Sequence, residues 1–307
     1  MANITAKDVA ALRAKTGLGM MDCKKALVEA EGDVEKAIKI LREKGLATAS
    51  KKESRIAAEG IVDVMTVGNT TAIIEVNSET DFVAKNAIFQ TFVKDLLKTV
   101  IANKPADVDA LMSCSFAGEE GGTVSDALAE KTGAIGEKLS IRRFVVVDGA
   151  VATYIHGAGA TGVIVSFDTD VAENEGFKEC AKNVALQVAA MPVLYLNKES
   201  VPASVLEEEK NILISQMKQD PKMANKPEQV LAKIVEGKLG KYFENNCLLE
   251  QLYVKDDSMT VAKYVASVAK ELGGNITVTG YVRFDKGEGI QKREEDFAAE
   301  IAKMVNG

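Results

Sequence analysis

The sequence contains no tryptophan and a single histidine, His156, and aromatic residues make up only 5% of its 307 residues. One histidine excludes a zinc site built from several histidines, and a Ser-His-Asp triad would have to use His156. A core without tryptophan must consist mainly of aliphatic side chains, with ten methionines and ten phenylalanines filling the gaps. The hydrophobic fraction of 47% is nevertheless that of an ordinary folded globular protein.

Cysteine is also scarce, and the four cysteines, Cys23, Cys114, Cys180 and Cys247, form no Cys-x-x-Cys pair. This wide spacing favours neither a disulfide scaffold nor a zinc site and is typical of a reducing compartment. The N-terminus lacks the basic-then-apolar pattern of a secretory signal, and no window approaches about 18 consecutive apolar residues. We therefore expect a cytoplasmic protein that makes no contact with a membrane.

Positive charge is in deficit, because 38 basic residues face 45 acidic ones and the net charge is −7. Nucleic-acid binding requires lysine and arginine opposite the phosphates, so we expect no direct contact with nucleic acid. One local basic stretch runs from Arg42 to Arg55, and we interpret it as a solvated linker.

The N-terminal residues 1–45 have the spacing of three short helices. Thr5 and Asp33 are candidate N-caps, and Gly45 is expected to end the third helix. A bundle this small is marginal alone and usually serves as a docking domain. The following residues, 46–59, are polar and small and are expected to form a linker.

An alternating pattern begins after the linker. Ile61 to Val76 predicts a β-hairpin with a turn at Gly68-Asn69, followed by helices over about 88–103 and 126–139. The same plan recurs, because strands over 143–147, 151–155 and 163–167 precede a helix over about 172–191.

We therefore predict an α+β fold with a duplicated sheet-plus-helix core rather than a doubly wound sheet. The first half comprises residues 60–140, and the second comprises residues 141–200 and 248–286. The second half is interrupted by residues 201–247, whose pattern predicts an inserted helical hairpin with a possible role in dimerisation. Residues 287–307 form a C-terminal module that ends in a helix.

Gly157 to Gly162 satisfies the pattern G-x-G-x-x-G. A dinucleotide site needs a helix directly after this loop, whereas residues 163–167 predict a strand, so a hairpin tip is favoured. The adjacent His156 is either a structural or surface residue or a contact to a partner. No cofactor-binding or metal-binding motif is found in the sequence.

Two further segments leave alternatives open. Met20-Met21 lies at a break between helices, where one methionine is either a core residue or an exposed docking contact. In Ser78 to Asn86, either Thr80 or Asp81 caps a helix and Phe82 is buried, or Phe82 projects beside the acidic Asp81 toward a partner. Since no catalytic constellation emerges, an interaction protein is the leading class.

Thr16 to Leu27 and Glu75 to Asn86 resemble the two signature segments of bacterial elongation factor Ts, and the similarity extends from Ile4 to Glu300. The resemblance implies a guanine-nucleotide exchange factor that binds elongation factor Tu with GDP. Such a factor displaces Mg²⁺ and GDP and stabilises the nucleotide-free GTPase until GTP binds. It also implies no bond chemistry and no cofactor, so the protein is not expected to be an enzyme.

The resemblance further implies site residues. The exchange residues are Thr80, Asp81, Phe82 and Val83, with Phe82 wedged beside the nucleotide site of the GTPase and Asp81 near its Mg²⁺. The partner-binding residues are Arg13, Met20, Met21 and Lys24 in a ubiquitin-associated-like bundle, and Ile135, His156 and Val254 in the core.

The inserted hairpin is similar to the dimerisation module of the family, which leaves a homodimer or a 2:2 complex open, and the C-terminal helix resembles a module that packs against the GTPase. One departure is that residues 158–162 lack the basic residue that the family usually carries there. The stretch from Ser113 to Gly122 is expanded and has no assigned function.

Two other hypotheses remain from the residues alone. A ubiquitin- or peptide-binding adaptor would rest on the N-terminal bundle, but it leaves the segment from Thr80 to Asn86 unexplained. A nicotinamide-dependent enzyme would rest on the glycine motif, and the strand predicted after that motif argues against it.

Overall fold

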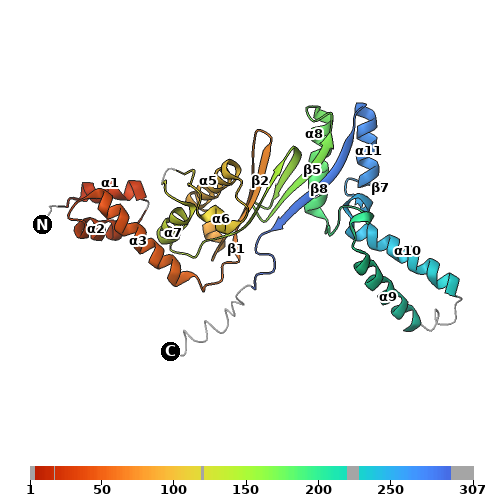
Figure 1. The fold of residues 1–307 in the computed structure, drawn as a ribbon, viewed down its shortest axis with the longest axis horizontal. Helices are drawn as coiled ribbons and strands as arrows, with labels where there is room; N and C mark the ends of the chain where they lie inside the picture. The colour runs from red at the N-terminus through yellow and green to blue at the C-terminus, as the bar shows by residue number, and fades with distance from the viewer. Residues whose placement is uncertain (1–3, 17, 119–120, 220–227, 292–307) are drawn as a thin grey trace. The chain divides into compact units, whose positions relative to one another are not determined.

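The computed structural model describes residues 4–16, 18–118, 121–219 and 228–291 (Figure 1). Its helices and small antiparallel sheets confirm the α+β fold. Contacts within the chain group into two compact units. Unit 1 comprises Met1–Val146, Gly157–Thr161 and Phe284–Gly307, and unit 2 comprises Val147–His156 and Gly162–Arg283. The finer domain boundaries expected from the sequence stay predictions.

The N-terminal bundle of unit 1 consists of α1 (Ala6–Thr16), α2 (Met20–Glu29) and α3 (Val34–Lys52). Asp33 caps α3 as predicted, because its carboxylate accepts hydrogen bonds of 3.0 Å from the N–H groups of Glu35 and Lys36. The three helices enclose a core of small and aliphatic side chains: Val9, Leu12, Leu18, Cys23, Ala26, Leu27, Ala30, Ala37 and Leu41.

The third helix does not end at Gly45, and the prediction that it does is wrong. α3 continues to Lys52, so the first part of the expected linker is helical. Gly45 lies against α7 (Val124–Ile135), where an added Cβ would approach the carbonyl oxygen of Ala129 to 3.2 Å. Glycine at this position therefore allows two helices to approach closely, and the alanines and lysines that follow it favour helix.

The Asp33 cap provides a first test of the bundle. Asp33→Ala should destabilise α3 by about 1 kcal/mol, because two N–H groups of its first turn lose their acceptor. Native-state amide hydrogen exchange in α3 measures this opening in the full-length chain. Asp33→Asn keeps an acceptor oxygen and is the matched control. An equal loss of protection in both variants would contradict the assigned role of the cap.

The sheet of unit 1 has the strand order β1-β2-β3, formed by Glu59–Val67, Thr70–Ser78 and Ser140–Asp148. β1 and β2 are antiparallel in a register from Glu59 opposite Ser78 to Val67 opposite Thr70. Their turn lies at Gly68-Asn69, with Gly68 at a φ of 60°. The predicted hairpin and its turn are thereby confirmed.

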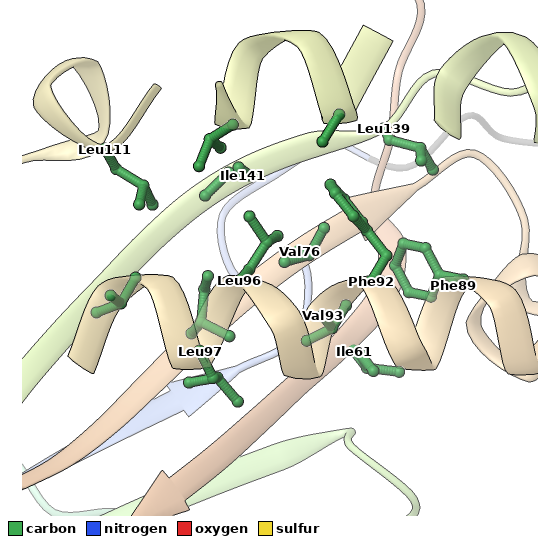
Figure 2. Close-up of a cluster of buried hydrophobic side chains, with 14 of the residues drawn as sticks. Ile61, Val76, Phe89, Phe92, Val93, Leu96, Leu97, Leu111, Leu139 and Ile141 are labelled. Carbon is green, nitrogen blue, oxygen red and sulfur yellow. The ribbon is translucent and has the colours of Figure 1, made fainter. Parts of the chain in front are cut away.

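Helix α5 (Ala87–Asn103) packs on β1 and β2 and confirms the predicted helix (Figure 1). α6 (Val108–Met112) was not predicted, since five residues are too few to show a helical period. α7 ends at Ile135, earlier than expected, because Gly136 adopts a left-handed φ of 84°. Figure 2 shows the resulting core, which includes Ile61, Val76, Phe89, Phe92, Val93, Leu96, Leu97, Leu111, Leu139 and Ile141.

Unit 2 repeats the combination of a three-stranded sheet with helices. Its sheet has the order β4-β5-β8, formed by Ala150–His156, Thr161–Thr169 and Ile276–Asp285. The strands share one buried cluster with α8 (Glu175–Ala190) and α11 (Val261–Leu272). A small sheet of β6 (Leu252–Tyr253) and β7 (Asp256–Thr260) lies in the same unit. A three-stranded sheet with helices thus recurs, as predicted. The strand predicted over 143–147 in the second half is nevertheless β3 of the first sheet, because it pairs with β2.

The predicted helical hairpin is formed by α9 (Ala203–Gln219) and α10 (Glu228–Asn246). Leu213 and Met217 of α9 pack with Val235 and Leu239 of α10. The predicted break at Asp220-Pro221 and the predicted terminal helix over 294–305 lie outside the described residues. In the part of the chain that the structure describes, no helix has the length and apolar composition needed to cross a membrane.

Candidate functional site

The turn that follows β2 carries the residues singled out in the sequence. β2 ends at Ser78, and the short helix α4 (Asp81–Ala84) begins three residues later. Thr80 occupies the N-cap position, but its hydroxyl does not cap the helix. It donates to Oε1 of Glu137 at 2.7 Å, and the Thr80 N–H donates to Oε2 of Glu137 at 2.9 Å. The expectation of a capping threonine is wrong, because the Thr80 hydroxyl oxygen accepts no N–H of α4 and the side chain is directed toward Glu137 instead.

Phe82 is 80% exposed, whereas Val83 and Ala84 beside it are buried. The alternative in which Phe82 is buried is therefore wrong. The ring projects from the turn, and its contact with a partner stays a prediction. Burying a phenylalanine side chain is worth about 1.5–3 kcal/mol. A partner that covers this exposed ring would therefore gain binding free energy from its burial.

Asp81 precedes this ring and is an anion at neutral pH. Its Oδ2 accepts a hydrogen bond of 2.6 Å from Nζ of Lys85, and half of the Asp81 side chain is exposed. This hydrogen bond, together with the positive charges of Lys85 and Lys286, holds the pKa of Asp81 below its ordinary value. The carboxylate can therefore interact with a cation or with a cation's ligands.

A hollow of about 240 Å³ lies directly beside Phe82. Its lining residues come from the α4–α5 segment and from the end of α7: Phe82, Val83, Asn86, Ile88, Ala134 and Ile135. The structure thus brings Ile135 next to Phe82 and Val83, as a common site requires. Ile88 is half exposed and was missed, because a hydrophobic residue in the first turn of a helix gives no signal of function.

The turn is fixed at a second point by the residue before Thr80. Glu79 accepts a hydrogen bond of 2.5 Å from the N–H of Lys138 and one of 3.2 Å from the guanidinium of Arg55. The ammonium group of Lys138 in turn donates to the carbonyl oxygen of Arg55 at 2.9 Å. The end of the basic stretch is therefore paired with this turn, and its interpretation as a purely solvated linker is wrong.

The bundle presents the four residues expected to contact a partner. Arg13 lies on α1, and Met20, Met21 and Lys24 lie on α2. All four are exposed, with 44% of Met20 and 62% of Met21 accessible. The alternative of a core methionine is therefore wrong, and Leu18 is buried in the bundle instead.

Two further expected contacts, His156 and Val254, belong to unit 2. His156 is the exposed last residue of β4, and its Nδ1 lies 3.3 Å from the hydroxyl of Tyr154. Val254 is 45% exposed and follows β6, where its N–H donates to Oε1 of Gln187 at 2.8 Å. Both side chains are accessible, and their roles stay predictions.

The glycine motif is a hairpin tip, as favoured from the sequence. Gly157 to Gly162 connects β4 to the strand β5 rather than to a helix, so the dinucleotide interpretation is wrong. The carbonyl oxygen of Gly159 accepts a hydrogen bond of 2.8 Å from the N–H of Val62. A Cβ at Gly159 would lie 2.9 Å from Cβ of Ile61, so this close approach requires glycine.

A buried carboxylate lies on the strand that leads into the turn. Glu75 on β2 is fully buried and accepts hydrogen bonds from Arg142 at 2.9 Å, Arg143 at 2.7 Å and the N–H of Gly287 at 2.8 Å. Burial alone would raise the pKa of Glu75, but these donors and the Asn77 amide outweigh it and lower the pKa. The network holds the chain around Gly287 on the sheet of unit 1.

Within the described ranges, no three His, Cys, Asp or Glu side chains are grouped in a way that would hold a metal ion.

Comparison with known proteins identifies relatives along nearly the whole chain. The profile of the family described as "Elongation factor TS" matches residues 79–288. The elongation factor Ts of Clostridioides difficile is 48% identical over 309 residues, which cover 99% of this chain and 100% of that protein. The elongation factor Ts of Syntrophotalea carbinolica is 47% identical over 305 residues, which cover 98% of this chain and 99% of that protein.

The α+β architecture and these matches together define a translation elongation factor. The chain belongs to the elongation factor Ts family, and the resemblance noted in its two signature segments is confirmed.

Proposed function

We propose that the protein is a guanine-nucleotide exchange factor for elongation factor Tu. It binds elongation factor Tu with GDP, displaces Mg²⁺ and GDP, and stabilises the nucleotide-free GTPase until GTP binds. The observation that carries this proposal is the 80% exposed ring of Phe82 beside the anionic Asp81, on a turn fixed by hydrogen bonds. Family membership supports it.

The turn has the properties that nucleotide displacement requires. Mg²⁺ neutralises the phosphates of a bound nucleotide and demands nearly ideal octahedral geometry, so a small displacement of its ligands releases it. A ring inserted between packed elements moves them from one discrete arrangement to another. In the proposed complex, Phe82 inserts beside the nucleotide site and Asp81 approaches the Mg²⁺ site. Thr80 and Val83 hold the turn, through Glu137 and through burial respectively.

This mechanism involves no bond chemistry and works by linkage. If an exchange protein lowers the affinity of the GTPase for GDP, then GDP must lower the affinity of the GTPase for the exchange protein by the same ratio. Calorimetric titration of elongation factor Tu with the chain, with and without GDP and Mg²⁺, tests this reciprocity. We expect much tighter binding to the nucleotide-free GTPase. Equal affinities in the two titrations would contradict the proposal.

We propose that the N-terminal bundle docks on the GTPase through Arg13, Met20, Met21 and Lys24, all of which are exposed. The core residues Ile135, His156 and Val254 provide further contacts. For the α9–α10 hairpin we propose a role in dimerisation, which gives a homodimer or a 2:2 complex. The mass of the complex, measured by light scattering, distinguishes 1:1 from 2:2.

The docking role of the bundle predicts an effect at Met21. Met21→Ser should weaken binding to elongation factor Tu by about tenfold, because a partner-covered apolar contact is lost. The stability of the bundle should not change, since 62% of Met21 is exposed. Val34→Ser is the matched control, because Val34 is an exposed apolar residue of the same bundle to which we assign no contact. Equal affinities of the two variants would disprove the role of Met21.

A further inference from the structure

We propose that Glu137 is a positioning residue for exchange, which holds the turn that carries Phe82 against the end of α7. This inference rests on the function proposed above. It assigns to Glu137 no contact with the nucleotide or with Mg²⁺, because both of its carboxylate oxygens accept hydrogen bonds from Thr80.

Helix α4 cannot fix its own direction. The helix has only four residues, Asp81–Ala84, and its N-cap side chain makes no capping hydrogen bond. Isolated helical turns are unstable, so the orientation of this turn must come from contacts outside it. Glu137 supplies two such contacts, to the N–H of Thr80 at 2.9 Å and to its hydroxyl at 2.7 Å.

The contact between the turn and the segment that follows α7 is reciprocal. The N–H of Lys138 donates to the carboxylate of Glu79, while the N–H of Thr80 donates to the carboxylate of Glu137. Two consecutive residues on each side thus exchange charge-assisted hydrogen bonds, which are stronger than neutral ones. Neither segment can shift along the other without breaking both bonds.

Phe82 and Ile135, which both line the hollow, lie on either side of this contact. Phe82 follows Thr80 closely in the chain, and Ile135 precedes Glu137 by two residues. Gly136 ends α7 in the left-handed conformation, which turns the chain from Ile135 toward Glu137. The exchanged hydrogen bonds therefore set the separation of Phe82 from Ile135 across the hollow that both residues line.

The first experiment compares variants in GDP release from elongation factor Tu at saturating concentrations of the chain. Glu137→Ala should lower the stimulated rate by about tenfold, because two hydrogen bonds to a charged group are lost. Glu137→Gln should fall in between, since its amide oxygen still accepts one of the two donors. Asp107→Ala is the control, because Asp107 likewise accepts a backbone N–H, that of Ala110 at 2.8 Å, at the start of α6. Equal rates for Glu137→Ala and Asp107→Ala would overturn the proposal.

A double-mutant cycle separates positioning from general stability. If Glu137 acts through Phe82, then adding Glu137→Ala to Phe82→Ala should change the rate by less than about twofold. A merely structural role predicts instead that the full loss persists in the Phe82→Ala background, and that result would overturn the inference.

The absence of tryptophan permits a direct measurement on the free protein. In Phe82→Trp the indole is the only one in the chain, and its fluorescence anisotropy reports the motion of the turn. Adding Glu137→Ala should lower this anisotropy, and adding Asp107→Ala should leave it unchanged. An anisotropy unaffected by Glu137→Ala would overturn the inference. Failure of the unmodified chain to stimulate GDP release would instead overturn the proposed function, because the anisotropy does not depend on the GTPase.

Discussion

Replacing Phe82 with alanine should slow the GDP release that the chain stimulates by about 30-fold, which corresponds to about 2 kcal/mol. The expected loss is large because the ring is the element that inserts into the GTPase in the proposed mechanism. The folding stability of the Phe82→Ala variant should not change, because Phe82 is 80% exposed. Surface substitutions away from packed sites usually alter stability by less than about 0.5 kcal/mol. The measurement is the release of a fluorescent GDP analogue from elongation factor Tu, together with a thermal unfolding curve of each variant.

The control for this prediction is Val67→Ala. Val67 is 55% exposed and lies at the far end of β1, beside the hairpin turn, where we assign no contact to the GTPase. The Val67→Ala variant should stimulate GDP release from elongation factor Tu as strongly as the unmodified chain does. Unchanged release by a folded Phe82→Ala variant would disprove the insertion of the ring and leave docking alone as the role of this turn.

Replacing Glu75 with glutamine should destabilise unit 1 by about 3–5 kcal/mol, the largest effect on stability that we expect. The substitution keeps the shape of the side chain but removes the charge that compensates the guanidinium groups of Arg142 and Arg143. Urea-induced unfolding followed by circular dichroism measures the loss. Glu244→Gln is the matched control, because Glu244 pairs with Lys241 at the surface and should contribute less than about 1 kcal/mol. Similar effects of the two substitutions would contradict the structural role of Glu75.

The difference in stability between the unmodified chain and Glu75→Gln should depend on pH. The pKa of Glu75 is lower in the folded chain than in the unfolded chain, because Gly287, Asn77 and the two arginines stabilise its anion. The difference should be fully present above the unfolded pKa of about 4.3 and should shrink as the pH falls through the lower folded pKa. A difference that persists undiminished in acid would show that charge is not its cause.

Local patterns in the sequence predicted the parts of the fold that depend on neighbouring residues. The Gly68-Asn69 hairpin, the Asp33 cap and the helix over 88–103 are confirmed because turn chemistry, capping and periodicity are local properties. The prediction that the third helix ends at Gly45 was wrong because this glycine contacts Ala129 of α7, more than 80 residues further along the chain. Such a contact leaves no local signal.

The candidate site shows the same limit. The polar surroundings of Phe82 allowed a projecting ring to be considered, but its exposure depends on what packs beside it, and this emerges only from the fold. Glu137 could not be predicted as the partner of Thr80, because 57 residues separate them. The buried Glu75 carried a weak signal, a charged residue within the apolar strand Thr70–Ser78, yet its arginine partners lie on another strand.

The most direct measurement is the release of a fluorescent GDP analogue from elongation factor Tu, chased with excess GDP, in the presence of a substoichiometric amount of the chain. We predict that release accelerates strongly and that each molecule of the chain acts on many molecules of the GTPase. Release that stays at the unstimulated rate, with a folded chain and the GTPase of the same organism, would contradict the proposed exchange activity.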